Sequence, residues 1–332
     1  MTASRAPQHS GIARATVIGT AVRRPLEGGP AHRPETQGLA ELLVIIAPIV
    51  APVFIVAAIG FGWARAGMPF DTEFTTTLVS NLSFPCLIIA TLAQLEIDPN
   101  AFSQMALAGA LTVLVTGAIA AIALRAADQK LPVYWPPLVF GNVGNMGLPL
   151  CLFAFGDEGL ALGIIFFTVF VAIQFTLGIS VAAGHLSVRT LVRTPLAWAC
   201  LVGIGLQLVG GTLPDWLANT IGLIGDLAIP MMLLTLGVAL AKLKVASLWR
   251  SVGLSLGRLG LGLAVGLALA EILGLEGAAR GVLILESAMP VAVLNYLFAA
   301  RYDRSPEEIA GLVLVSTAIS FVTLPALLVI VL

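Results

Sequence analysis

The sequence has little charge for its length. Asp, Glu, Lys and Arg make up only 11% of its 332 residues, whereas soluble domains carry about 25%. Hydrophobic residues make up 58%, and the mean hydropathy is +1.01. Such a chain has too few polar groups to cover a soluble fold. We therefore predict an all-α polytopic membrane protein, embedded in a lipid bilayer.

Cysteine is scarce and scattered. Cys86, Cys151 and Cys200 stand singly in apolar segments, with no CxxC or Cys/His spacing. We therefore expect them to be small core residues rather than disulfides or metal ligands. A net charge of −1 and the lack of a basic stripe argue against binding of nucleic acid.

Motifs of enzymes are also missing. No Walker A motif is present, so ATP is not expected to drive the protein directly. An enzyme would need a nucleophile and a base within reach of one another. The three histidines lie in the N-terminal tail or in a loop: His9, His32 and His185. We predict that the protein is not an enzyme and that it holds neither a cofactor nor a metal.

What the sequence does have is a succession of apolar runs, each long enough to cross a bilayer, which takes about 20 residues. Residues 1–39 differ because they are rich in Arg, Pro and Gly and contain no sustained apolar run, which predicts a disordered N-terminal tail or a leader. The apolar runs predict ten transmembrane helices at 42–63, 75–95, 101–124, 133–155, 158–182, 194–213, 217–240, 247–272, 279–300 and 306–331.

The distribution of Lys and Arg predicts the orientation, because positive residues favour cytoplasmic loops. The loops after the odd-numbered spans hold ten Lys or Arg residues, and those after the even-numbered spans hold only Arg280. We expect the odd-numbered loops in the cytoplasm and both termini outside it, in a multi-pass protein of a bacterial inner membrane. The arginines of the N-terminal tail argue for the opposite orientation, but most lie too far from a span to act.

The chain matches itself when it is shifted by 145 residues. NLSFP at 81–85 then falls on DLAIP at 226–230, which pairs Asn81 with Asp226. Each unit holds five spans, and because five is odd the second unit must be inverted in the membrane. This predicts a five-plus-five inverted repeat, with units at 40–184 and 185–332, which is typical of secondary transporters.

The stretch GNVGNMGLPL, residues 141–150, places glycines, asparagines and a proline inside the fourth span. In the same register Asn145 falls on Pro290 in the ninth span, so both units carry a helix breaker at one point. Backbone groups freed by Gly and Pro are tolerated at bilayer depth only where they are packed in protein or line a wet cavity. We therefore expect two broken helices, 4 and 9, that meet near the midplane.

A break in a helix exposes a half-helix N-terminus, whose free N–H groups and positive dipole end suit a carboxylate. Asparagine amides can donate hydrogen bonds to the same ligand. The substrate-binding candidates from this reasoning are Asn142, Gly144, Asn145, Gly147, Pro149, Pro290 and Asn295.

Three charged residues lie inside apolar runs, where a charge is costly and a function is the default hypothesis. Glu286 is a candidate for ion coupling, unless it lies at the external mouth and merely reaches water. Asp226, together with its repeat mate Asn81, has either an ion-coupling role or a structural or gating role. Arg258 needs a partner, for which Glu286 and Glu271 are candidates.

Five segments, in their order and spacing, resemble the auxin efflux carrier family in its bacterial branch, a branch of the bile acid/auxin/arsenite type of transporters. They are PVFIVAAIGFGWARAG, NLSFPCLIIATL, GNVGNMGLPL, LAIPMMLLTLGVAL and ESAMPVAVLNYLFA. The resemblance covers about residues 42–332. It implies that helices 4 and 9 cross, that helices 1, 2, 6 and 7 form a scaffold that often dimerises, and that helices 3–5 and 8–10 form a mobile transport domain. It also implies a substrate-facing role for Gln174, against which stands simple hydrogen bonding between helices.

Two functions follow from the sequence and the resemblance. The first is a secondary active transporter of small organic anions, such as malate, malonate, lactate or an auxin-like acid, that works by alternating access of the elevator type with proton or sodium coupling. The second is a sodium-coupled carrier of a bulkier amphipathic anion, similar to bile acid/sodium symporters. A sensor that does not transport, or a membrane enzyme, comes third. A homodimer through the scaffold helices is expected in either transporter.

Overall fold

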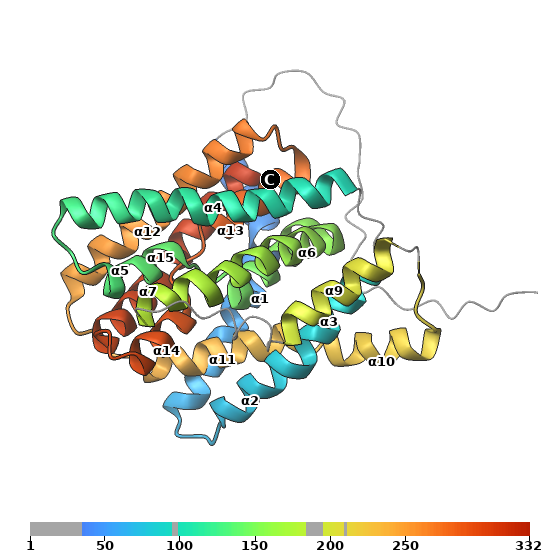
Figure 1. Cartoon of the computed structure of the whole chain (residues 1–332), viewed down its shortest axis with the longest axis horizontal. Helices are drawn as coiled ribbons and strands as arrows, with labels where there is room; N and C mark the ends of the chain where they lie inside the picture. The colour runs from blue at the N-terminus through green and yellow to red at the C-terminus, as the bar shows by residue number, and fades with distance from the viewer. Residues whose placement is uncertain (1–34, 95–98, 184–194, 209–210) are drawn as a thin grey trace, which may run out of the picture. The chain divides into compact units, whose positions relative to one another are not determined.

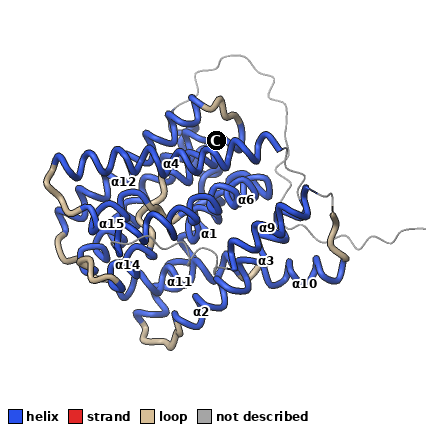
Figure 2. The backbone as a smooth tube through the Cα atoms, in the orientation of Figure 1, coloured by secondary structure: helices blue, strands red, loops and turns tan. Residues whose placement is uncertain are grey.

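The computed structural model describes residues 35–94, 99–183, 195–208 and 211–332, so most of the predicted tail and all three histidines lie outside the described residues. The described chain is helical with short loops (Figure 2), and residues from Glu41 onward form one compact unit. The elements in chain order are α1 (Glu35–Arg65), α2 (Thr72–Leu78), η1 (Val79–Ser83), α3 (Phe84–Gln94), α4 (Pro99–Ala126), α5 (Leu131–Val139), η2 (Val143–Gly147), α6 (Leu148–Ile173), η3 (Gln174–Gly178), α7 (Ile179–Ala183), α9 (Pro195–Leu208), α10 (Asp215–Gly225), α11 (Ala228–Lys242), α12 (Leu248–Ile272), α13 (Gly277–Ser287), α14 (Val293–Arg301) and α15 (Pro306–Val331).

Seven stretches of the described residues are helical, long and apolar enough to cross a membrane, so the protein is a polytopic membrane protein. The number is smaller than the predicted ten for local reasons. The fourth and fifth predicted spans are counted as one continuous stretch, Val143–Ala182. The ninth is divided between two short helices, α13 and α14, and the described part of the sixth, α9, has 14 residues. The count of ten and the repeat stay predictions.

Local sequence explains where several helices begin and turn. The Asp71 carboxylate accepts a hydrogen bond from the Phe74 N–H (2.9 Å) and thereby caps α2. Gly156 has φ of 66° and divides α6 where the fourth and fifth predicted spans meet, because a glycine adopts this left-handed conformation without steric cost. Near the N-terminus, α1 begins at Glu35. Residues 35–39, which the sequence assigned to the disordered tail, are therefore helical.

The helices pack in two groups. In the first, α3 lies beside α9 and α10, and α2 contacts α11 (Figure 1). In the second, α4 lies beside α6, α12 packs on α13 and α15, and α14 contacts α15. The two groups touch where α3 and α9 meet α6 and where α11 meets η2. We call this contact between α3, α9 and α11 on one side and α6 and η2 on the other the seam, and any site shared between the two groups lies there.

One helix contact depends on two glycines that lack a side chain. A Cβ on Gly60 of α1 would collide with the Leu234 carbonyl oxygen of α11, and a Cβ on Gly237 of α11 would collide with the Ala57 carbonyl oxygen of α1. Small residues allow such close approach of transmembrane helices, where dispersion rather than water exclusion holds the helices together. Gly62 lies two residues further along α1, on nearly the opposite face of the helix, and a Cβ there would have no described atom within 4 Å.

The fold therefore predicts that Gly60→Leu lowers the thermal stability of the purified protein in detergent, whereas Gly62→Leu leaves it nearly unchanged. Overpacking of this kind costs about 1 to 3 kcal/mol or more. Both variants add the same apolar side chain, so an equal loss of stability in the two would contradict the close contact between α1 and α11.

Candidate functional site

Two helical segments are interrupted, and both interruptions fall in the predicted spans. α5 ends at Val139, and the chain resumes as the π-helical turn η2 after the non-helical residues 140–142. α13 ends at Ser287, and α14 begins at Val293 after a stretch that contains Pro290. The first break lies before Asn145 rather than at it, because Asn145 belongs to η2. Pro149 does not break a helix, since it sits in the first turn of α6, where a missing N–H is tolerated.

The two breaks pair with one another. Gly141 and Val291 form an isolated antiparallel bridge, and the Asn142 N–H donates to the Pro290 carbonyl oxygen (2.7 Å). A two-residue sheet of this kind replaces hydrogen bonds that the helices lose at their breaks. Buried backbone groups need such partners, above all in a bilayer.

Two side chains complete this pairing. The Asn295 amide Nδ2 donates to the Phe140 carbonyl oxygen (2.8 Å), and the Ser316 hydroxyl accepts from the Val291 N–H (3.0 Å). Asn295 is buried at the start of α14, and its hydrogen bond reaches across to the break that follows α5. Its role in this structure is thus to fix the geometry of the break.

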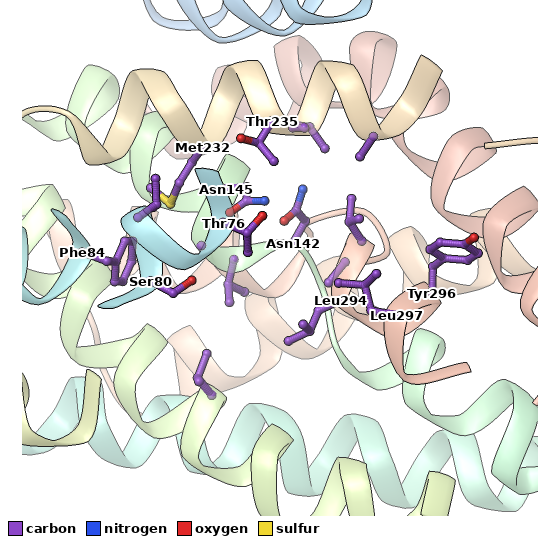
Figure 3. Close-up of a pocket in the computed structure, with 18 of the residues that line it drawn as sticks. Thr76, Ser80, Phe84, Asn142, Asn145, Met232, Thr235, Leu294, Tyr296 and Leu297 are labelled. Carbon is purple, nitrogen blue, oxygen red and sulfur yellow. The ribbon is translucent and has the colours of Figure 1, made fainter. Parts of the chain in front are cut away.

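A cavity of about 530 Å³ lies at the seam beside the paired breaks, within the size range of ligand sites. Figure 3 shows that it lies between α11 on one side and η2 and α14 on the other. Its lining is largely apolar and consists of Thr72, Thr76, Val79, Ser80, Asn81, Phe84, Gly141, Asn142, Val143, Gly144, Asn145, Phe167, Val171, Gln174, Phe175, Pro195, Met232, Thr235, Leu236, Ala239, Lys242, Leu243, Ala292, Val293, Leu294, Tyr296 and Leu297.

All three π-helical segments of the described chain contribute to this lining. They are η1, η2 and η3. Short π-helical turns within α-helices are rare and occur frequently at functional sites, because the extra residue redirects side chains and frees backbone groups. Their convergence on one cavity makes it the candidate functional site, independently of the predicted breaks.

Several polar groups of the lining have no hydrogen-bond partner among the residues that the structure describes. The Asn142 Nδ2, the Gln174 Nε2 and the Thr235 Oγ1 are buried without a hydrogen bond. Asn142 is 4% exposed and Gln174 is 2% exposed. In Figure 3 the side chains of Asn142 and Asn145 extend from η2 and its cap toward Thr235 on α11. Buried polar groups are nearly always paired, so these are available to a ligand.

The charge of the lining has one sign. Lys242, at the end of α11, is the one charged residue among the described residues that line the cavity, and its Nζ donates to the Thr72 hydroxyl (3.0 Å). No carboxylate belongs to the described lining. A cation, free amides and apolar walls suit an organic anion.

A model of the family described as membrane transport protein matches residues 44–185 and 181–328. The chain belongs to this family. An uncharacterized transporter of Methanothermobacter thermautotrophicus is 26% identical over 294 residues, which cover 83% of this chain and 95% of the relative. An uncharacterized transporter of Methanocaldococcus jannaschii is 24% identical over 208 residues, 59% of this chain and 67% of that one.

In this transporter, five of the predicted site residues line the cavity and six do not. The lining includes Asn81, Asn142, Gly144, Asn145 and Gln174. The lining does not include Gly147, Pro149, Asp226, Glu286, Pro290 and Asn295.

Asp226 and Gly147 lie apart from the cavity for different reasons. Asp226 is exposed at the junction of α10 and α11. Gly147 is buried on the far side of η2, where a Cβ would collide with the Glu286 carboxyl group.

For the buried charges, the structure excludes one alternative and corrects one expectation. Glu286 has no exposed surface, so it is not a mouth residue that reaches water. Neither predicted partner forms an ion pair with Arg258 in the described chain: Glu286 accepts a hydrogen bond from Cys151 (3.5 Å), and Glu271 pairs with Arg280 (3.6 Å). The described cysteines, including Cys151, are free, as predicted.

Sequence reasoning missed six polar residues of the described lining: Thr72, Thr76, Ser80, Thr235, Lys242 and Tyr296. Thr76 and Ser80 are four residues apart, which puts them on one helix face, and this spacing was the available signal. Thr235 stands alone in an apolar run, and Lys242 was counted only as a loop charge. A threonine in a transmembrane helix is usually a packing residue, so only its unpaired hydroxyl in the cavity distinguishes Thr235.

The site predicts that Lys242→Gln weakens binding of carboxylates such as lactate or indole-3-acetate about two- to fivefold, because loss of one exposed charge costs up to about 1 kcal/mol. Lys244→Gln is the matched control, since Lys244 is exposed two residues further on and outside the lining. Equal dissociation constants for the two variants at low salt would contradict a local role of Lys242.

Proposed function

We propose that the protein is a secondary active transporter of small organic anions, which works by alternating access of the elevator type. The observation that carries this proposal is the cavity at the paired breaks, with unpartnered amides and one lysine in its lining and no carboxylate among the described residues there. Membership of the membrane transport protein family supports the transport function. Candidate substrates are malate, malonate, lactate and an auxin-like acid.

A second candidate is a sodium-coupled carrier of a bulkier amphipathic anion, similar to bile acid/sodium symporters. The apolar walls of the cavity favour an acid with an apolar body over a small dicarboxylate. Phe84, Phe167 and Phe175 contribute aromatic surface to these walls, whereas Lys242 offers a single positive charge. A second carboxylate of a dicarboxylate would have no cation opposite it.

Alternating access is supported by the packing of the helices in two groups with the cavity at their seam. In the proposed ten-helix inverted repeat, helices 1, 2, 6 and 7 are a scaffold that also forms a homodimer, and helices 3–5 and 8–10 move as a transport domain. Small rigid-body shifts of one group against the other would carry the site from one side of the bilayer to the other.

The energy source is a proton or sodium gradient, with Glu286, Asp226 and Asn81 as the candidates for ion coupling. Glu286 is buried directly behind η2. Asn81 lines the cavity, and Asp226 is exposed where α10 ends. The position of Glu286 supports it above the other two, because a carboxyl group inside a membrane protein is retained at a cost and marks ion or proton pathways.

The test is binding and exchange of lactate and indole-3-acetate by purified protein and by Asn145→Ala. The amide of Asn145 and the N–H groups of η2 are expected to hold the carboxylate. A hydrogen bond to a charged group is worth about 1.5 to 3 kcal/mol, so the affinity should fall roughly tenfold to hundredfold. Exchange of labelled acid in proteoliposomes should slow accordingly.

Gly144→Leu separates anion binding from simple packing. A Cβ on Gly144 meets the Phe167 ring at 2.8 Å, so leucine there should disturb folding whatever the ligand is. If the glycines only allow close packing of the breaks, Gly144→Leu will fail while Asn145→Ala binds normally. An unchanged dissociation constant for Asn145→Ala would refute the anion site.

The proposed orientation puts both termini outside the cytoplasm in a bacterial inner membrane. The cavity would then open to the cytoplasm, because its lining includes Thr72, Pro195 and Lys242 at the ends next to lysine- and arginine-rich loops. Cysteines placed at Asp128 and Asp157 test this: an impermeant thiol reagent should label the first only from the cytoplasm and the second only from outside. The reverse pattern would overturn the orientation.

A further inference from the structure

One cation lies inside the protein without a counter-charge among the described residues. Arg258, in the middle of α12, is 1% exposed. The ion pairs of the described chain involve other arginines, Arg250 and Arg280. The Arg258 Nε has no hydrogen-bond partner among the described residues either. A charge within a membrane protein is costly, and such charges mark the paths and sites of ions and substrates.

The guanidinium group of Arg258 is held in place between the two helix breaks and α12. Its Nη1 donates to the Ser287 carbonyl oxygen (3.0 Å), at the end of α13. Gly262 lies one turn further along α12, and a Cβ there would collide with this carbonyl oxygen and with Nη1. The other terminal nitrogen, Nη2, lies against Gly141, where a Cβ would be 2.3 Å from it. The guanidinium therefore occupies room that two missing side chains leave.

Gly141 connects this cation to the cavity. It lines the cavity and pairs with Val291 between the breaks. Because Gly141 has no side chain, it contributes only backbone between the guanidinium and the cavity. The next residue, Asn142, lines the same cavity, and its Nδ2 is buried without a partner among the described residues. The cation and the free amide thus lie at the same part of the wall.

No described group neutralises Arg258 fully. The carbonyl end of α13 offsets part of the charge through its dipole. Glu286, the buried carboxyl group of α13, lies against Gly147 on the far side of η2 and accepts a hydrogen bond from Cys151 (3.5 Å). It forms no ion pair with Arg258 in the described structure. An anion bound next to Gly141 would supply the counter-charge that these residues do not.

We propose that Arg258 is a specificity-determining residue of this site, a fixed cation that acts through Gly141 and makes the cavity prefer anions. It is a positioning residue, because it does not itself line the cavity and acts across the backbone of Gly141. This proposal rests on the proposed function. It assigns most of the preference for a negative charge to Arg258 and a smaller part to Lys242.

The surroundings of the two cations explain this division. Lys242 is exposed, whereas Arg258 is buried. Salt screens charges that are exposed to water and screens buried charges much less. A buried unit charge a few ångströms from a ligand changes its affinity by about tenfold to a hundredfold. A guanidinium also stays protonated at neutral pH, so this cation is always present.

The first test compares each acid with its neutral amide, which has nearly the same shape. The pairs are lactate with lactamide and indole-3-acetate with indole-3-acetamide. Purified wild-type protein should bind each acid at least about tenfold more tightly than its amide at about pH 7, where the acids are ionised. Most of this preference should persist in about 1 M sodium chloride, where the screening length is about 3 Å. A preference that disappears in high salt would assign it to Lys242 and overturn the proposal.

The second test removes the charge of Arg258. Arg258→Met, which puts an unbranched neutral side chain there, should weaken binding of each acid at least about tenfold and binding of each amide less than about threefold. Arg258→Lys keeps the charge and should keep most of the preference. Arg125→Gln is the matched control, since Arg125 is exposed at the end of α4 and outside the lining, and it should change neither affinity. If Arg258 only holds the end of α13, Arg258→Met will weaken acid and amide equally.

The outcomes separate this inference from the proposed function. If wild-type protein binds and exchanges neither acid, the proposed function fails, and this inference fails with it. If wild-type protein binds an acid and Arg258→Met prefers that acid over its amide as strongly as wild type does, only this inference is overturned. If Arg258→Met does not fold, the wild-type comparison in high salt decides, because the neutral donors of the lining can bind an amide carbonyl as well as a carboxylate.

Discussion

The structure depends on the need of backbone N–H and C=O groups for partners in a place that water does not reach. α5 and α13 both stop inside apolar segments, and each stop leaves groups that a bilayer cannot satisfy. The bridge between Gly141 and Val291 answers this need for both segments at once. Because each break satisfies the other, neither segment is stable alone in this form, and the two are held at one point.

This pairing of the breaks determines where the polar groups of the candidate site lie. η2 starts next to the bridge, so the amides of Asn142 and Asn145 extend into the seam between the two groups of helices. Arg258 lies against Gly141, which lines the cavity, whereas Glu286 lies against Gly147 on the far side of η2. The paired breaks are thus flanked by a buried cation and a buried carboxyl group.

Much of the fold could be predicted from the sequence, and the errors have physical causes. Apolar runs indicated helices because their hydrophobic length matches a bilayer. The break was placed at Asn145, although it precedes η2, because π-helical turns leave no signal in hydrophobicity. For Arg258 the expected partners were carboxylates, yet it bonds to the Ser287 carbonyl oxygen. Distance along the chain does not show which buried groups meet.

The sequence by itself determined that the chain is a helical membrane protein and that two of its segments carry helix breakers, because composition and apolar length act locally and independently of the fold. It also gave Asn142 and Asn145 as candidate site residues, and the resemblance to a known family added Gln174. Only the tertiary structure decided that Thr235 and Lys242 share a cavity with them and that Glu286 lies outside it. These facts depend on contacts between segments far apart in the chain, and no local pattern encodes such contacts.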